Sequence, residues 1–487
     1  MTREPMKHHR YRFIDLGTLG GSVTKIFFGA ARQSQVQVIN NRGMLAGWST
    51  TTTPDPFPDF CWEADCMVAH TFETRNGIKK DLGTLPGGSS SSVWISDNGL
   101  IAGEAENGQL DPLNPGFPQI HAVLWKHGAI SDLGTLNGGY QSIAHAVNSA
   151  GQVVGYSLNT IDDPDSMYGS FYGIAYQQTR AFLWQNGVMQ DLGTLDTGTN
   201  AMALLVNERG QIAGDSYTST DPSPSCSYDV SFFPLTTGGF LWENGKMTDL
   251  GGFGGTCTVV TGLNNQGQVI GISNLVGDQS YHPYLWDPHA RRHLRDLGTL
   301  GGNFATAEAM NDIGDVVGNA DLTGDLVTHA TLWRHGRITD LGTVGTDLCS
   351  IGFSINSARQ VVGISSPDCT FAEANAFLWE RGGPMIDLND FVPPDSDLHL
   401  RAGATINDRG EIAVAGLRTN GFAGSALLIP CDEEPRDSEG CREAAKQHMG
   451  TDKNPAVQPS AAAERRGIGF LPRPARDVES NGGRDRR

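Results

Sequence analysis

A short apolar pattern ending in Asp-Leu recurs along the whole 487-residue chain, and this repetition limits the fold more than any other feature. The stretch HAVLWKHGAISDLGTLNGG begins at His121, and close copies begin at Arg180 and His329. The Asp-Leu pairs lie on average about 53 residues apart, a spacing typical of propellers and solenoids. The aspartates are Asp15, Asp81, Asp132, Asp191, Asp249, Asp296, Asp340 and Asp387.

A second motif follows each Asp-Leu pair: Asn-x-x-Gly and then two apolar residues, as in NSAGQVVG. Ser96 replaces the Asn in the second copy, and Arg359 replaces the Gly in the seventh, which keeps Asn356. In a type I turn, Asn at the first position bonds to the backbone, and Gly at the fourth takes a positive φ. The motif therefore predicts a tight turn between two short strands. Complete copies begin at Asn40, Asn148, Asn207, Asn264, Asn311 and Asn407.

Each repeat is long enough for four short strands. In order they are an innermost strand A-x-A-x-N, a strand such as QVVGYS, a strand such as AFLW and a strand M-x-D-L-G. Four antiparallel strands per repeat are typical of a β-propeller blade, and small residues such as Ala144 and Ala146 fit its narrow axis. The repeated Trp before the second tight turn is expected to pack between blades. It occurs at Trp125, Trp184, Trp242, Trp286, Trp333 and Trp379.

The two ends of the repeat region complement each other. The first strand, within residues 11–17, has the form of a lone fourth strand, and the last repeat ends at residues 425–430 without one. We therefore predict an all-β, eight-bladed propeller over residues 11–430, closed by pairing of the N-terminal strand with the last blade. An open solenoid would need a cap at each end. Residues 1–10 and 431–487 are predicted to be disordered, since the tail has one aromatic residue and little else for a core.

The repeats resemble the bacterial HAF repeat, which is named for a His-Ala-Phe run and described as an extracellular repeat of unknown function. The resemblance covers residues 11–430. It implies export to the outside of the cell or the cell envelope, and it supplies no catalytic residue. The His position holds His70, His121, His282 and His329, and is replaced by Arg180, Gly238, Asn375 and Ser425.

Charge and hydropathy limit the kinds of partner and the locations that fit this chain. The formal net charge is −19, so wrapping a nucleic-acid backbone is excluded. No apolar run approaches the length of about 18 residues that a membrane helix needs. The first 17 residues lack the apolar region of a signal peptide, which leaves a cytoplasmic protein, or a start farther upstream, as the alternative to export. We expect a monomer.

The long loops between the second and third strands of the first four repeats are the predicted binding surface. The two tight turns of a blade share one face, so these loops share the other face with the GTLGG links. Aromatic rings and carboxylates in such loops suit carbohydrate or a protein partner; the alternative is that the Pro-rich loops pack on themselves. The predicted ligand contacts are Trp62, Tyr168, Tyr172, Tyr176, Tyr217, Tyr228, Asp162, Asp163 and Asp165.

Metal binding and catalysis are weaker interpretations of the same residues. The carboxylates of DDPDS, residues 162–166, could hold calcium, but they lack the spacing of an EF-hand loop, and a solvated acidic loop is the better explanation. The repeated Asp residues are expected to accept backbone N–H bonds in the following link. The repeated His residues are expected to be buried or capping, because equivalent blade positions lie far apart.

The eight cysteines fit the same face. Cys61 and Cys66 share one long loop, and the others fall in neighbouring loops. We predict four local disulfides, with eight reduced thiols as the alternative. The remaining predicted pairs are Cys226–Cys257, Cys349–Cys369 and Cys431–Cys441.

These observations predict a non-catalytic binding protein. The alternatives are a structural surface protein and a polysaccharide lyase or hydrolase on the same scaffold. Such an enzyme would need non-repeating acid and base groups that converge near the axis. His145 and Arg401 are non-repeating residues of innermost strands, but they belong to different blades.

Overall fold

The computed structural model describes residues 10–26, 35–75, 77–168, 177–223, 225–228, 231–380 and 382–431. Nearly all of the two ends predicted to be disordered therefore lies outside the described residues, as do Tyr172, Tyr176 and Cys441. Tyr228 is described only as part of a strand. Among the described residues, no helix is long and apolar enough to cross a membrane.

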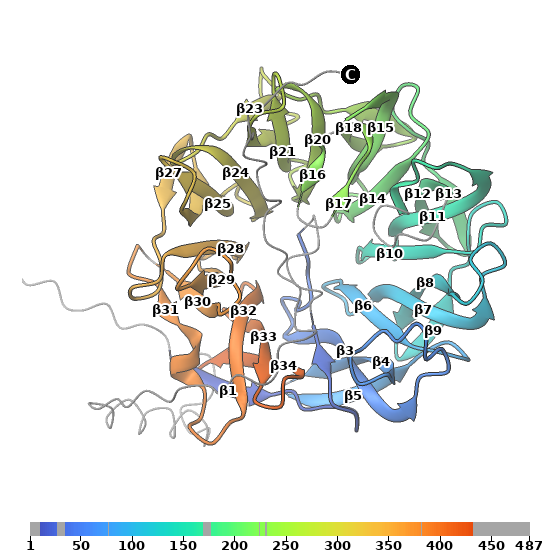
Figure 1. Ribbon diagram of the computed structural model, residues 1–487, viewed down its shortest axis with the longest axis horizontal. Coiled ribbons are helices and arrows are strands. Elements are labelled where there is room, and N and C mark those ends of the chain that lie inside the picture. Colours follow the sequence, from blue (N-terminus) through green and yellow to red (C-terminus); the bar gives the residue numbers. More distant parts are fainter. Residues whose placement is uncertain are drawn as a thin grey trace, which may run out of the picture.

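The chain folds into four-stranded antiparallel groups that follow one another around a central axis (Figure 1). The first group contains β2 (Thr24–Lys25), β3 (Met44–Pro54), β4 (Met67–Arg75) and β5 (Ile78–Gly83). The second contains β6 (Ser90–Ile95), β7 (Ile101–Leu110), β8 (Pro118–Lys126) and β9 (Ala129–Asp132). The third contains β10 (Ser142–Val147), β11 (Val153–Asp162), β12 (Gln177–Gln185) and β13 (Val188–Asp191).

Three further groups are joined into a twelve-stranded sheet by single parallel residue pairs, Thr237 with Cys257 and Tyr281 with Phe304. The fourth group contains β14 (Ala201–Val206), β15 (Ile212–Pro222), β18 (Leu235–Glu243) and β19 (Lys246–Asp249). The fifth contains β20 (Gly254–Leu263), β21 (Val269–Leu275), β22 (Tyr281–Trp286) and β23 (Leu294–Asp296). The sixth contains β24 (Gly301–Met310), β25 (Val316–Leu322), β26 (Thr328–Arg334) and β27 (Arg337–Asp340). A hairpin of β16 (Ser227–Tyr228) and β17 (Ser231–Phe232) lies in the loop after β15.

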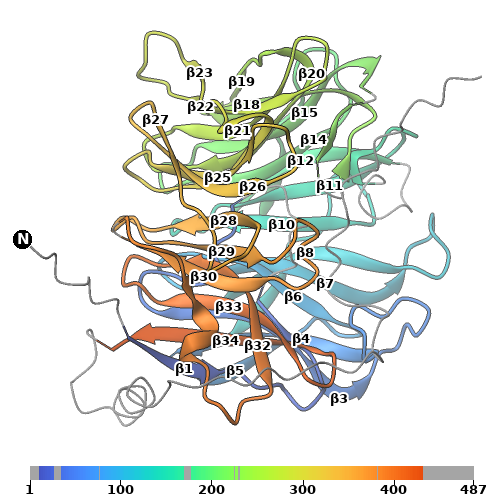
Figure 2. The same cartoon turned by 60° about the vertical axis from the view of Figure 1, so that its left-hand side comes forward.

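The last group takes its outer strand from the other end of the chain. The seventh group contains β28 (Cys349–Ile355), β29 (Val361–Ser366), β30 (Asn375–Trp379) and β31 (Ile386–Asp387), and a 3-10 turn, η1 (Leu388–Phe391), follows it. The last group contains β32 (Leu398–Ile406), β33 (Ile412–Arg418), β34 (Ala423–Pro430) and β1 (Tyr11–Asp15). β1 pairs antiparallel with β34, from Tyr11 opposite Pro430 to Asp15 opposite Ala426 (Figures 1 and 2).

The tight turns form as the sequence predicts. In the Asn148 turn, the side-chain oxygen accepts the N–H groups of Ala150 and Gln152, at 3.1 Å each, and Gly151 has a φ of 78°. Arg359, in place of the Gly, adopts the same left-handed conformation with a φ of 64°, and its guanidinium contacts Asp315 at 2.6 Å. Residues that carry a side chain rarely adopt this backbone conformation, and here it occurs together with the ion pair.

The same Asn side chains also join the groups. Each side-chain amide donates to a backbone carbonyl in the next group, for example Asn207 to Asn264 at 3.0 Å. In the second group Ser96 lacks the amide, and Asn98 donates to Ser149 at 2.8 Å instead. The series returns to its start, because Asn407 donates to Asn40 at 2.9 Å. The other donors are Asn40, Asn148, Asn264, Asn311 and Asn356.

The repeated tryptophans pack in the core as predicted, with one exception. Trp125, Trp242, Trp286, Trp333 and Trp379 are buried, whereas Trp184 is partly exposed. Burial of such a side chain contributes about 2–3 kcal/mol. The apolar clusters therefore run around the axis in the contacts between neighbouring groups.

Candidate functional site

The repeated Asp residues have the structural role predicted for them. Each accepts the backbone N–H of the residue two positions later; Asp81, for example, accepts from Gly83 at 2.7 Å. The same bond is made by Asp15, Asp132, Asp191, Asp249, Asp296, Asp340 and Asp387. The same backbone bond in every group gives these aspartates a common structural role.

The residues of the His position pair with these aspartates across two strands, a contact that the sequence did not predict. His121 Nδ1 lies 2.9 Å from the Asp132 carboxylate, and Arg180 makes the corresponding contact with Asp191 at 3.0 Å. Burial opposes ionisation of Asp132, but the hydrogen bonds from His121 and Gly134 outweigh it and hold its pKa below the ordinary value. His70, His282 and His329 make equivalent contacts.

The dipeptide Asp-Pro anchors the long loops, a role that was not predicted from the sequence. Asp111 Oδ1 accepts from the N–H of Leu113 at 2.8 Å, and its Oδ2 accepts from Gln141 of the next group at 2.8 Å. Asp55 binds Phe57 and Ser89 in the same way, at 2.8 and 3.3 Å. Each of these two loops is thereby fixed to the next group by a carboxylate.

The third loop uses a predicted ligand contact for this purpose. Asp163 is only 8% exposed, and its Oδ2 accepts from Asn200 of the fourth group at 2.8 Å. In the fourth loop Ser223, which follows an Asp-Pro dipeptide, lies 2.6 Å from the Thr256 hydroxyl of the fifth group. We therefore assign Asp163 to anchoring and not to ligand contact.

Two predicted aromatic contacts are also buried. Tyr168 and Tyr217 are 0% exposed, and the Tyr217 hydroxyl donates to the backbone oxygen of Asp165 at 2.9 Å. The Tyr168 ring packs 6.0 Å from that of Tyr156, and Tyr217 lies within β15, so neither ring presents a face to solvent. Trp62 and Asp165 are partly exposed and Asp162 is exposed, so these three remain available on the surface.

Three of the predicted disulfides are present: Cys61–Cys66, Cys226–Cys257 and Cys349–Cys369. The first closes one long loop, and the other two join neighbouring segments of the same face. Such bonds persist in oxidising compartments. The fourth predicted pair involves Cys441 and lies outside the described residues.

Two carboxyl groups are buried beneath the first loop. Glu106 is 0% exposed, and its Oε2 accepts the N–H of Ser89 at 2.8 Å, while Asp55 accepts from the Ser89 hydroxyl. Burial raises the pKa of Glu106 to about 8, against the hydrogen bond from Ser89. Burial likewise raises the pKa of Asp215, elsewhere in the core, to about 8.

These raised pKa values give stability a definite pH dependence. Below the ordinary carboxyl pKa these groups are protonated in both the folded and the unfolded protein, so they do not change the free energy of unfolding. As the pH rises toward 8, they release protons in the unfolded protein but stay protonated in the folded one, which favours unfolding. The free energy of unfolding should therefore fall between about pH 5 and pH 8, by at most about 1.4 kcal/mol per pH unit and per group. Glu106→Gln should remove the contribution of that group, which denaturant titrations at pH 5, 7 and 8.5 would measure. Asp162→Asn, at an exposed site, is the control, and an unchanged slope in Glu106→Gln would contradict the assignment.

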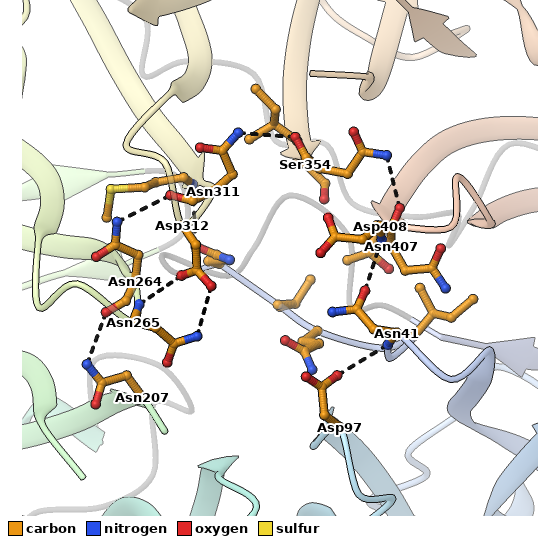
Figure 3. A pocket seen from close by; sticks show the side chains of 18 of the residues that line it. Asn41, Asp97, Asn207, Asn264, Asn265, Asn311, Asp312, Ser354, Asn407 and Asp408 are labelled. Atoms are coloured by element: carbon orange, nitrogen blue, oxygen red, sulfur yellow. Dashed lines mark hydrogen bonds between the residues drawn. The ribbon is translucent and has the colours of Figure 1, made fainter. Parts of the chain in front are cut away.

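A polar cavity opens on the axis at the opposite face, where the Asn turns meet (Figure 3). Its volume is about 180 Å³. The Asn side chains that join the groups form its wall, together with residues that follow them, such as Asn265 and Asp312. The segment of residues 35–37 lies across it: Gln35 N–H donates to Thr261 of the fifth group at 2.6 Å, and Gln37 Nε2 donates to Ile95 of the second at 2.8 Å. The sequence predicts function on the long-loop face and contains no clear signal for this cavity.

The non-repeating residues near the axis do not converge. The His145 ring packs at 5.2 Å from that of Tyr156 in its own group, and the Arg401 guanidinium bonds to Ala372 between the last two groups. In the described part of the chain, no three His, Cys, Asp or Glu side chains are arranged to hold a metal ion.

Comparisons with known proteins assign no family. No family model and no curated protein matches the sequence, so the resemblance to the HAF repeat remains a prediction. Among solved structures, TolB from Acinetobacter baumannii matches 79% of this chain and 80% of its own, at 11% identity and a TM-score of 0.30. Dipeptidyl peptidase 4 from Porphyromonas gingivalis matches 90% and 61%, at 10% identity and 0.35. A gluconolactonase from Xanthomonas campestris matches 52% and 78%, at 12% identity and 0.27. Similarity this low carries no argument about function, and the propeller-like architecture rests on the strand pairing of the chain itself.

Proposed function

We propose that the chain is a non-catalytic binding protein, built as a closed eight-bladed β-propeller that recognises carbohydrate or protein through its long-loop face. The closed ring is supported by the β1–β34 pairing and by the Asn407–Asn40 hydrogen bond, which both join the last group to the start of the chain. An extracellular or cell-envelope location is supported by the three disulfides.

The observation that carries this function is the anchoring of the long loops. Buried carboxylates, Asp55, Asp111 and Asp163, tie the first three loops to the following blade, and a disulfide ties the fourth loop to the next. An irregular surface that is fixed before binding loses little conformational entropy when a ligand arrives. On that surface Trp62 of the first loop offers part of an aromatic ring, and Asp162 and Asp165 of the third loop offer carboxylates, groups that suit carbohydrate or protein recognition.

A glycan array tests this proposal directly. Wild-type protein should bind a defined set of glycans, and the variant Trp62→Ala/Asp162→Asn/Asp165→Asn should bind them at least tenfold more weakly, equal to about 1.4 kcal/mol. Glu243→Gln, an exposed carboxylate in a tight turn of the other face, should bind as wild type does. Because the proposal also covers a protein ligand, a cross-linking screen against cell-surface proteins accompanies the array.

Two results would refute the proposal. One is unchanged binding by the triple variant of whatever ligand the two screens identify. The other is release of shortened or unsaturated sugar from a bound polysaccharide, which would establish the enzyme alternative.

A further inference from the structure

The second tight turn of the fifth group differs from its counterparts in length and charge. Nine residues, 287–295, separate Trp286 from Asp296, whereas six separate the Trp from the Asp in the second, third, fourth and sixth groups. The longer turn reads DPHARRHLR and carries Arg291, Arg292 and Arg295. Because the chain has a formal net charge of −19, this basic turn departs from the charge of the molecule as a whole.

The one carboxylate in the sequence of this turn is occupied by other partners. Asp287 Oδ1 accepts the N–H of His289 at 2.8 Å, and its Oδ2 accepts from Gln268 Nε2 at 2.9 Å. The N–H of Asp287 donates to the His293 oxygen at 2.8 Å, and the His293 ring packs 5.5 Å from that of Trp286. The backbone of the turn is therefore fixed without the help of its arginines.

Those arginines are exposed and unpaired. Arg291, Arg292 and Arg295 make no ion pair and no side-chain hydrogen bond with any residue that the structure describes. By contrast, Arg180 and Arg418 each pair with a carboxylate. An unpaired guanidinium at the surface keeps its five N–H donors for a ligand.

The neighbouring sixth group extends this surface. Its equivalent turn ends at Arg337, which is exposed and also lacks an ion-pair partner in the described part of the chain. Trp333, which precedes that turn, donates from Nε1 to the oxygen of Gly298 in the fifth group at 3.2 Å, so the outer strands β23 and β27 belong to groups in contact (Figure 1). We call this set the basic edge: Arg291, Arg292, Arg295 and Arg337.

The carboxylates that follow these turns do not bond to the basic edge. Asp296 lies 2.8 Å from His282 Nδ1, and Asp340 lies 2.9 Å from His329 Nδ1. The guanidinium groups of the basic edge therefore remain available to an external anion.

The arrangement favours an extended ligand. Four guanidinium groups spread over two groups suit a chain with repeated anionic groups, since each guanidinium can donate two parallel N–H bonds to one of them. A flat anionic membrane fits less well, because the same face carries the exposed Glu208, Asp312 and Asp408 around the axis. The three disulfides support an oxidising compartment, where acidic polysaccharides rather than nucleic acids are the common linear polyanions.

We propose that the basic edge binds a linear acidic polysaccharide through its carboxylate or sulfate groups. The basic edge lies on the face of the tight turns, opposite the long loops, so this binding does not depend on the function proposed for the loops. It should weaken as the salt concentration rises, because salt screens exposed charges.

Calorimetric titration at low ionic strength with polygalacturonate and with dextran sulfate tests this site. The variant Arg291→Gln/Arg292→Gln/Arg295→Gln/Arg337→Gln should bind at least tenfold more weakly than wild type. Thermal unfolding should be unchanged, because none of the four side chains has a partner to lose. Tighter binding of polygalacturonate would identify a uronate polymer, and tighter binding of dextran sulfate a sulfated one.

A charge-matched control separates the basic edge from the net charge. Arg42→Gln/Arg75→Gln/Lys126→Gln/Lys246→Gln removes four exposed positive charges elsewhere and should bind both polymers as wild type does. The long-loop variant Trp62→Ala/Asp162→Asn/Asp165→Asn should also bind as wild type does, which keeps this test separate from that of the loops. The proposal would be overturned if wild type bound neither polymer, if the control weakened binding equally, or if oligothymidylate or anionic lipid vesicles bound the basic edge more tightly than both polymers.

Discussion

A chain that begins at residue 17 should unfold about 10 °C or more below the full chain and should aggregate on heating. The deletion removes β1, which supplies five residue pairs to β34, the buried Tyr11 ring and the Asp15–Arg418 ion pair. Tyr11 packs 5.3 Å from Phe391, and its burial alone contributes about 2–3 kcal/mol. The deletion also leaves β34 as an unpaired edge, which favours association between molecules. Calorimetry and light scattering during heating would measure both effects.

The matched control is a chain that begins at residue 10, which keeps β1 and should unfold at the temperature of the full chain. A synthetic peptide of residues 10–17, added to the shortened chain, should restore part of the lost stability by pairing with β34. Equal unfolding temperatures for the two truncated chains would show that β1 does not close the ring.

Asn264→Ala should lower the free energy of unfolding by about 2–4 kcal/mol, because it removes four hydrogen bonds at a buried position. The Asn264 amide donates to Asn311 and to Gln268 Oε1, at 3.2 and 2.8 Å. Its oxygen accepts the N–H groups of Gln266 and Gln268, at 3.0 Å each. The substitution therefore weakens both the turn and the contact between two groups, and denaturant unfolding would report the loss.

Gln266→Ala, two residues away and exposed, is the control and should change stability by less than about 0.5 kcal/mol. If Asn264→Ala and Gln266→Ala lowered the free energy of unfolding by the same small amount, the Asn264 side chain would not contribute specifically to the contact between the groups. The loss of stability in Asn98→Ala should be intermediate, since Asn98 makes the contact with the next group from an exposed position.

The features that repetition or short-range geometry determines could be predicted from the sequence. The strand order of β10 to β13, the turn at Asn148 and the backbone bond of Asp132 follow from local residue types, and the repeat multiplies each signal. The Cys226–Cys257 pair could be predicted because a four-stranded unit places alternate connections on the same face.

The side chains of the long loops could not be assigned in the same way. Periodicity does not show whether an aromatic ring in or beside a long loop is buried, as those of Tyr168 and Tyr217 are. The anchoring by Asp111 and Asp163 had a signal in the repeated Asp-Pro dipeptide, but loops of different length obscured it. The axial cavity was missed because its rim residues, such as Asp97 and Asn265, differ from one repeat to the next, and variation at a turn position resembles an ordinary surface.

The segment of residues 35–37 has a consequence for assembly of the molecule. It belongs to the first group by sequence, yet its backbone bonds to Thr261 of the fifth group and its side chain to Ile95 of the second. Thr261 can take its place beside Gln35 only after the fifth group has been synthesised. The contacts of residues 35–37 are therefore completed late. During synthesis Gln35 is made more than two hundred residues before Thr261, the residue to which its backbone bonds.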